Sequence, residues 1–276
     1  MSDHYQKVFN ALSLPEIYPH SCEIITTIET HISAVFLTGE FAYKFKKPVD
    51  FGFLDFTDLE QRKHFCLKEL QLNRRTAPEV YLDVFAIEFQ NGQYTLTSLE
   101  ECQNPVEYVV KMKQFDPNDV LSKYLKRVVF SDQLIKSLVS NIVHLHTHAE
   151  IIDDSNPWGN PEIVLKPMTD NFGALKSFEI DEHFSQKIQA ISGWTVDQSE
   201  QLRDKITDRK KQEKVRACHG DLHIDNIAVI DDKAVLFDGI EFNEQFRCID
   251  VISDLAFLIV DLMYRKKSDK AMEILS

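Results

Sequence analysis

A short hairpin flanked by polar residues is the feature that most restricts how this chain can fold. Residues 219–242 read HGDLHIDNIAVIDDKAVLFDGIEF. The two apolar runs, 227–230 and 234–237, are joined by Asp231-Asp232-Lys233, a pattern that predicts two short strands and a tight turn. Asn226 directly precedes the first run and Asp238 directly follows the second. A hairpin would therefore bring these two oxygen-bearing side chains together at its open end.

Composition narrows the class of protein. The chain has 276 residues, of which 43% are hydrophobic and 27% charged, which is typical of one large globular domain or of two lobes that share a cleft. The net charge of −13 argues against nucleic acid as a general partner. No apolar run approaches the roughly 18 residues that a membrane span needs, and no signal peptide is recognisable. The five cysteines are scattered and never form CxxC, so we predict a cytoplasmic protein without a membrane partner.

Strand patterns dominate the first part of the chain and helix patterns the second. We predict strands over 23–47, 79–89, 93–100 and 106–115, and helices over 57–75, 131–150 and 251–265, with mostly helical structure in 151–215. The predicted fold class is therefore α+β, with a β-rich N-lobe that contains one helix and a mostly helical C-lobe. We place the N-lobe at 1–112, a hinge at 113–118 and the C-lobe at 119–276.

Phosphoryl transfer is a chemistry that these polar residues could perform. It requires neutralisation of phosphoryl charge by Mg²⁺ and a cation, together with a base that orients a hydroxyl group. Mg²⁺ prefers oxygen ligands and retains several waters, so Asn226 and Asp238 are candidate metal ligands. Asp221 lies five residues before Asn226 and is the candidate base. For any one of these residues alone, a turn in which the side chain bonds its own backbone is the simpler interpretation.

The combination of motifs resembles a known family. HGDLHIDN is similar to the catalytic loop HGDxxxxN of the aminoglycoside phosphotransferase / choline kinase-like family, the small-molecule relatives of protein kinases. LFDGIEF resembles the metal-binding segment that corresponds to DFG. The resemblance implies a two-lobed protein-kinase-like fold with ATP and Mg²⁺ as cofactors, Asp221 as the base, and Asn226 and Asp238 as metal ligands.

Three longer phrases resemble a bacterial branch of that family. They are YKFKKPVDFGFLDF, LNRRTAPEVYL and HGDLHIDNI. The kinase-like domain of this branch is often followed by a P-loop domain, whereas this chain contains no GxxxxGK[ST].

The resemblance also implies a nucleotide site in the first part of the chain. FAYK, residues 41–44, is similar to the VAIK of the third kinase strand, so Lys44 would contact the α/β-phosphates and Ala42 would line the adenine pocket. VKMKQF resembles the hinge, where backbone groups from Met112 to Gln114 would hold adenine. The carboxylate that pairs with the lysine is expected to be Glu69, with Glu60 as the alternative.

Several residues allow two interpretations. Lys46 shares a strand face with Lys44, but the Ala-x-Lys pattern selects Lys44, and we expect Lys46 to point toward the lobe edge where its charge is screened. Glu241 is either a further metal or substrate ligand or a solvated hairpin end. We expect His146 to be structural, and Asp254, in SDLAFL, matches an Asp that bonds the catalytic loop in the family. No GxGxxG lies between the first strands, where ETHIS takes the turn.

The expected function is ATP- and Mg²⁺-dependent phosphorylation of a hydroxyl group on a small molecule. A protein kinase is a weaker alternative, because SDLAFL begins only fifteen residues after Asp238 and leaves little room for an activation loop. A catalytically idle nucleotide-binding or scaffold domain is the second alternative, since the glycine-rich loop is absent. The sequence identifies neither the phosphate acceptor nor the oligomeric state.

Overall fold

The chain forms two compact units in the computed structural model, which describes residues 3–175, 178 and 181–276. The first unit comprises residues up to 142, residues 223–243 and residues 272–276, and the second comprises 143–222 and 244–271. These units do not coincide with the predicted lobes, because the hairpin at 227–236 clusters with the N-terminal part of the chain. The predicted lobe boundaries therefore stay a prediction.

A six-stranded sheet forms the centre of the first unit. Its strands follow the order β1-β2-β3-β6-β4-β5, and every neighbouring pair is antiparallel. The strands are β1 (Thr26–Glu29), β2 (Ser33–Leu37), β3 (Phe41–Lys46), β4 (Tyr81–Gln90), β5 (Gln93–Ser98) and β6 (Pro105–Lys113). The turn between β4 and β5 is the predicted Asn91-Gly92 pair, whose φ angles are 53° and 83°. Such left-handed residues match the twist of a tight hairpin, which confirms this turn.

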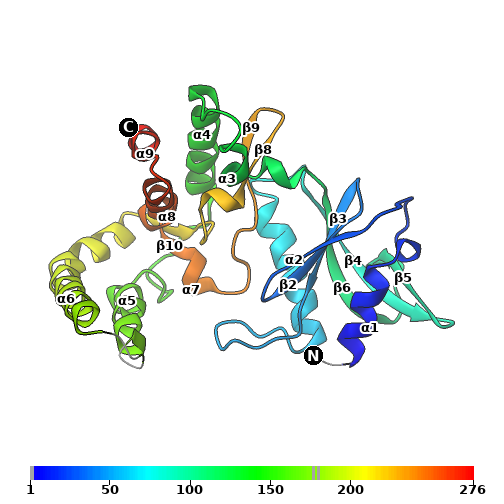
Figure 1. The fold of residues 1–276 in the computed structure, drawn as a ribbon. Coiled ribbons are helices and arrows are strands. Elements are labelled where there is room, and N and C mark those ends of the chain that lie inside the picture. The colour runs from blue at the N-terminus through cyan, green and yellow to red at the C-terminus, as the bar shows by residue number, and fades with distance from the viewer. Residues whose placement is uncertain (1–2, 176–177, 179–180) are drawn as a thin grey trace. The chain divides into compact units, whose positions relative to one another are not determined.

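One helix contributes to the core on each face of this sheet (Figure 1). Because successive strand side chains point to opposite faces, Tyr43 and Phe45 of β3 join α1 (Asp3–Leu12) in one cluster, where the rings of Tyr5 and Phe45 stack at 5.3 Å. Ala42 lies in the other cluster with residues of α2 (Leu59–Asn73). The two lysines of β3 share the face of Ala42 and therefore face α2.

Helix α2 is fixed at its start by two sets of contacts. The Asp58 side chain accepts from the Glu60 and Gln61 backbone N–H groups and caps the helix. Arg62 forms a buried ion pair with Glu107 of β6, 2.8 Å between Nη2 and Oε2. These contacts set the position of the helix beside the sheet.

The predicted hairpin is present in the first unit. Strands β8 (Ile227–Ile230) and β9 (Lys233–Leu236) pair with Ile227 opposite Leu236. The two turn residues, Asp231 and Asp232, have φ angles of 49° and 60°, as a two-residue hairpin turn requires. The unit also contains η2 (Pro117–Asp119), α3 (Leu121–Tyr124) and η3 (Ile224–Asn226).

The second unit is mainly helical. Its elements are α5 (Pro161–Leu175), α6 (Glu182–Lys211), β7 (Val215–Ala217), α7 (Glu244–Arg247), β10 (Cys248–Asp250) and α8 (Val251–Tyr264). Strands β7 and β10 pair in antiparallel fashion around a small core with Ile152. Helices α4 (Asp132–His148) and α9 (Ser268–Leu275) cross the boundary between the units.

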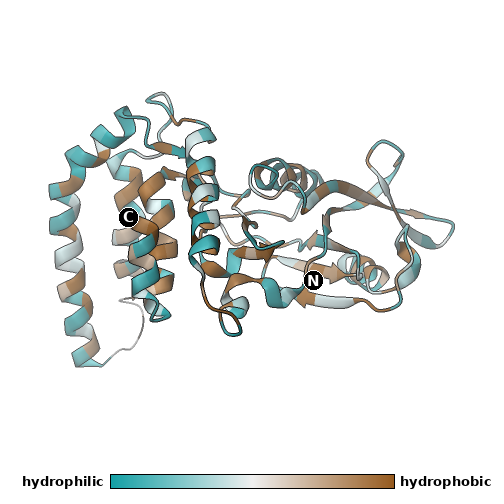
Figure 2. Ribbon diagram, turned by 90° about the horizontal axis from the view of Figure 1, so that it is seen from above, coloured by the Kyte–Doolittle hydropathy of each residue, from teal (hydrophilic) through white to brown (hydrophobic). Residues whose placement is uncertain are grey.

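The longest helix of the second unit, α6, is capped by the Asp181 side chain and tied at its other end by Arg209, whose guanidinium bonds both oxygens of Asp250 at 2.5 and 2.7 Å. Hydrophilic and hydrophobic residues both occur along this helix (Figure 2). Within the described part of the chain, no helix combines the length and apolar character needed to cross a membrane.

Candidate active site

Two lysines of β3 bind one buried carboxylate of α2. Lys44 Nζ lies 2.7 Å from Glu69 Oε1, and Lys46 Nζ lies 2.6 Å from Glu69 Oε2. Glu69 is fully buried, and Glu60, the alternative carboxylate, is exposed. Glu69 therefore shares its two oxygens between the two lysines of the YKFKK motif.

Lys46 is buried, so the expectation that it points toward a screened edge is wrong. It is 1% exposed, and its ammonium donates to Glu241 as well as to Glu69. Glu241 is itself 5% exposed, which rules out a solvated hairpin end. The physical reason is that the lysine face of β3 points at α2, so a residue two positions beyond Lys44 stays in the core.

The pKa values of these groups follow from opposing effects. Burial lowers the pKa of Lys44, but Asp238 and Glu69 overcome that effect and raise it well above its ordinary value. Burial likewise acts against the charge of Glu69, yet the two lysines lower its pKa below the ordinary value. Burial raises the pKa of Glu241, and Lys46 opposes this rise. The lysines thus remain ammonium ions inside the protein, held by the carboxylates around them.

Asp238 lies beside Lys44 at a strained point of the backbone. Its Oδ1 is 2.5 Å from Lys44 Nζ, and its φ angle is 62°, a left-handed value that Asp adopts more readily than most residues. The Asp238 backbone N–H donates to the Tyr81 hydroxyl at 3.1 Å, and the Gly239 N–H donates to Asn73 Oδ1 at 2.8 Å. Thr76 donates to the Leu236 carbonyl at 2.8 Å.

The residues that hold this segment come from the LNRRTAPEVYL motif. Asn73, Thr76 and Tyr81 all belong to it. The sequence alone does not predict these contacts, because a contact between segments more than 150 residues apart leaves no periodic signal. The motif thus fixes the main chain on both sides of the Asp238 carboxylate.

The hairpin register brings Asn226 and Asp238 to the same end. The Phe237 N–H donates to the Asn226 carbonyl at 3.0 Å, which extends the β8–β9 ladder by one pair beyond Ile227 and Leu236. Asp238 is the next residue, and its side chain is 44% exposed. Asn226 is 8% exposed.

A mostly apolar cavity of about 190 Å³ lies beside Lys44 in the first unit. Its lining includes Ala42, Lys44, Met112, Gln114, Phe237 and Asp238. All the nucleotide-site residues predicted from the sequence except Glu69 therefore line a single cavity, and its charged lining residues include Lys44 and Asp238. Glu69 lies behind Lys44, in contact with its ammonium.

The predicted hinge uses part of its backbone within the protein. The Lys113 N–H donates to the Val80 carbonyl at 2.8 Å, and the Gln114 N–H donates to the Glu40 carbonyl at 3.0 Å. The Gln114 side chain accepts from the Gly39 N–H at 2.9 Å. The two Gln114 bonds join the end of β6 to the turn before β3, and the Lys113 bond joins it to the residue before β4.

A hydroxyl-bearing turn stands where protein kinases have a glycine-rich loop. The Thr30 hydroxyl lies 3.0 Å from the Ser33 hydroxyl, and both residues line the cavity. Lys47, 6% exposed, donates to the Thr30 carbonyl and to Glu29, each at 2.7 Å. The third lysine of YKFKK thus fixes this turn.

The second unit contains the first half of the HGDLHIDN loop. Gly220 has a φ of 88°, and a Cβ there would lie 3.0 Å from the Phe246 carbonyl oxygen and 3.1 Å from Arg247 Cα. Only glycine fits this position without displacing backbone. Asp221 follows directly and is partly exposed.

Asp254 fixes the backbone of that loop. It is fully buried at the start of α8, and it accepts from the Gly220 N–H at 2.9 Å, the His219 N–H at 3.2 Å and His146 Nε2 at 2.8 Å. Burial opposes its charge, but these donors lower the pKa of Asp254 below the ordinary value. Asp254 and His146 therefore have the structural roles that the sequence predicted.

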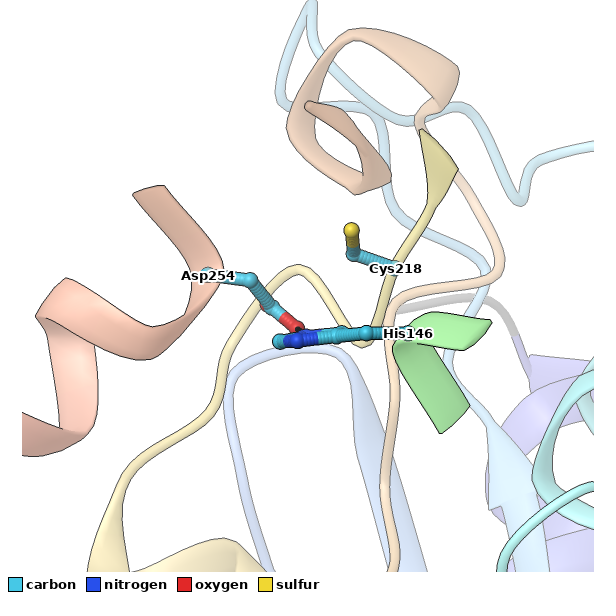
Figure 3. A group of neighbouring side chains, drawn as sticks. All are labelled: His146, Cys218 and Asp254. Atoms are coloured by element: carbon cyan, nitrogen blue, oxygen red, sulfur yellow. Dashed lines mark hydrogen bonds and ion pairs between the residues drawn. The ribbon is translucent and has the colours of Figure 1, made fainter. Parts of the chain in front are cut away.

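His146 and Asp254 also come close to Cys218, as Figure 3 shows. One ligand atom from each lies within 4.8 Å of the others, which is close enough for a metal ion. However, Asp254 already accepts the three bonds above, and the Cys218 thiol donates to the Ile249 carbonyl at 3.4 Å. Hydrogen bonding accounts for this cluster without an ion.

The chain matches no protein-family profile. It is 26% identical over 249 residues to uncharacterised proteins of Mycobacterium tuberculosis and Mycobacterium bovis, which covers 87% of this chain and 46% of theirs. The chain therefore spans less than half the length of these relatives.

Among solved structures, a choline/ethanolamine kinase family protein from Mesorhizobium loti superposes with a TM-score of 0.50 at 11% identity, over 98% of this chain and 75% of that one. The fold is kinase-like. An ADP-bound aminoglycoside phosphotransferase, APH(2'')-Ib, gives a TM-score of 0.45 at 14% identity, over 98% of this chain and 86% of that one. The predicted α+β class, with a β-rich sheet and one helix before a helical part, is confirmed.

Proposed function

We propose that this chain binds ATP and Mg²⁺ and transfers the γ-phosphoryl group to a hydroxyl of a small molecule. The observation that carries the proposal is Lys44, whose ammonium contacts both Glu69 and Asp238 beside an apolar cavity. A cation held by a helix carboxylate next to a metal-binding Asp is the arrangement that kinases use for ATP phosphates.

The cavity suits a nucleotide. Ala42 is small and lies two residues before Lys44 on the same strand face, so adenine would stack beside it while the phosphates extend to the ammonium. Because the N–H groups of Lys113 and Gln114 are engaged, the amino group of adenine would donate to a carbonyl of the Met112–Gln114 segment. The Thr30 and Ser33 hydroxyls would donate to phosphate oxygens.

Asn226 and Asp238 fit a magnesium site. They offer an amide oxygen and a partly exposed carboxylate at one end of the hairpin, which are hard oxygen donors of the kind Mg²⁺ prefers. When bound, Mg²⁺ would neutralise charge on the phosphates. Lys44 would then supply further positive charge at the α/β-phosphates.

Asp221 would accept the proton of the acceptor hydroxyl. Its position depends on the loop that Gly220 and Asp254 shape, because the backbone N–H groups of the two preceding residues, His219 and Gly220, donate to the Asp254 carboxylate. The base thus has a rigid frame, which proton transfer at a defined geometry requires.

The test is ADP release from Mg·ATP over a panel of hydroxylated amines, sugars and amino alcohols. Asp238→Ala should abolish turnover while the fold remains intact, because the metal loses a ligand. Asp232→Asn, in the turn of the same hairpin, is the matched control and should retain the wild-type rate. Equal turnover in folded Asp238→Ala would contradict the proposal.

The proposed base has its own test. Asp221→Asn should lower kcat by about 10²–10⁴-fold while ATP binding changes little, since the proton acceptor acts only in the chemical step. ATP binding without turnover on any panel member, in the wild type, would favour an idle nucleotide-binding domain instead.

A further inference from the structure

The Lys46–Glu241 pair has no part in the reaction described above. Its two side chains are among the most deeply buried charged groups of the first unit, at 1% and 5% exposed. Burying two charges is costly, and a buried pair is often replaceable by apolar residues without loss of stability. The pair therefore calls for an explanation other than stability.

The pair connects α2 to the segment that begins at Asp238. Glu241 lies three residues after Asp238 and binds Lys46, which in turn binds Glu69 of α2. The same helix ends with Asn73, which accepts from the Gly239 N–H. Residues 238–241 are thus tied to one helix at two points, directly through Asn73 and indirectly through Lys46.

Resting on the proposed function, we propose that Lys46 and Glu241 are positioning residues that hold the Asp238 carboxylate where it can bind Mg²⁺. Asp238 has a left-handed backbone, at φ 62°, and a partly exposed carboxylate bound to Lys44, and the Tyr81 and Asn73 contacts hold the main chain at 238 and 239. The tie at Glu241 limits the directions in which the segment can rotate. Metal affinity would then depend on an ion pair that touches neither metal nor nucleotide, as is common for residues behind metal ligands.

The positioning role can be tested separately from the effect of charge on Mg²⁺ binding, with a variant that keeps the net charge of the cluster. Two lysines and three carboxylates (Lys44, Lys46, Glu69, Asp238 and Glu241) sum to +2 − 3 = −1 when all are ionised. Lys46→Met with Glu241→Met removes one charge of each sign and leaves +1 − 2 = −1. The double variant therefore removes the tie but keeps the net charge near the metal constant.

The experiment measures ATP binding by calorimetry at graded Mg²⁺ concentrations, on the full chain. For Lys46→Met/Glu241→Met, the Mg²⁺ concentration for half-maximal binding should rise by about tenfold or more. The single variant Lys46→Met sharpens the test, because it makes the cluster more negative. Electrostatics alone would then tighten Mg²⁺ binding, whereas loss of the tie weakens it.

The matched control replaces a different buried ion pair, which joins α2 to β6. Arg62→Met/Glu107→Met makes the same chemical change in the pair that fixes the start of α2. Its Mg²⁺ midpoint should stay within about twofold of the wild type if the effect belongs to the Asp238 segment. Circular dichroism confirms that each double variant is folded.

The outcomes separate this proposal from the proposed function. Wild-type protein that binds no ATP at any Mg²⁺ concentration overturns both. Wild-type protein with Mg²⁺-dependent binding, and a folded Lys46→Met/Glu241→Met variant with the same midpoint, overturns only the positioning role. Tighter Mg²⁺ binding in Lys46→Met also overturns it, because that is the result that electrostatics alone would give.

Discussion

The two units each bury a carboxylate completely, but they compensate its charge in different ways. Glu69 in the first unit is held by two lysine ammonium groups, and Asp254 in the second is held by two backbone amides and a histidine. Lysine side chains are long and have several rotatable bonds, so they can move toward a new anion. Backbone amides in a loop that requires glycine have no such freedom to move toward a new anion.

The difference indicates which of the two clusters can adapt to a ligand and which one is held by backbone groups. If the proposed function holds, charges around Glu69 can redistribute on binding of a metal and a polyphosphate, because Lys44 is shared between Glu69 and Asp238. The loop around Asp254 is instead held by two backbone hydrogen bonds and by a position that only glycine fits. In the proposed function, the nucleotide would bind at the adaptable cluster around Glu69, and the loop held by Asp254 would position the base.

The largest effect is expected from removal of Asp254. Asp254→Ala leaves two buried amides and His146 without their acceptor, so the free energy of unfolding should fall by about 3–5 kcal/mol. Chemical denaturation measures this loss. The control is Asp261→Ala, which breaks an Asp261–Arg265 pair of 2.7 Å on the same helix and should cost at most about 1 kcal/mol. Equal losses of unfolding free energy in the two variants would show that the Asp254 bonds stabilise the fold no more than the Asp261–Arg265 pair.

Loss of Lys44 is expected to affect function more than stability. Lys44→Met should lower ATP turnover by about 10²–10³-fold, because a charge aimed at the phosphates is removed while Lys46 still neutralises Glu69. Lys111→Met serves as control, since that ammonium lies over the Phe41 and Phe85 rings, 4.1 and 5.0 Å from their centroids. A Lys44→Met enzyme with wild-type turnover would move the phosphate contact to Lys46.

Gly220 gives a smaller test of the rigid loop. Gly220→Ala should cost about 1–3 kcal/mol of unfolding free energy, because the new Cβ is strained by the positive φ and meets backbone atoms at 3.0 and 3.1 Å. Gly52→Ala measures the cost of the positive φ alone. Its φ is 77°, and among the described residues a Cβ there would meet nothing within 4 Å. If both variants lose the same stability, the close approach at Gly220 has no cost.

The smallest expected effect is on the pH dependence of stability. The folded pKa of Asp254 is below its ordinary value of 3.8, so its contribution to stability is complete above that pH and is lost as the pH falls through the folded pKa. The stability difference between wild type and Asp254→Asn should therefore shrink on acidification below about pH 4. Urea unfolding at pH 3–7 measures it. A difference that stays constant would mean that Asp254 is not held as a carboxylate.

The sequence predicted elements with strong local patterns. The Asn91-Gly92 turn and the hairpin between Asn226 and Asp238 follow from residue type and alternation, and the motif resemblance selected Glu69 over Glu60. Lys46 was misplaced because alternation places a residue on a face but does not say how far the covering helix extends along it. The contacts of Asn73 and Tyr81 with the Asp238 segment could not be predicted from the sequence either, since they join distant parts of the chain.

The pairing of β8 with β9 limits how homologous chains can differ in length. A one-codon insertion in either strand would shift the register by one residue and turn every following side chain to the opposite face. Asn226 and Asp238 would then no longer leave the ladder together. Insertions at Asp231 and Asp232 would instead lengthen the turn and leave the residue pairs of β8 and β9 intact. Evolutionary variation in the spacing of these two residues should therefore be confined to the tip of the hairpin.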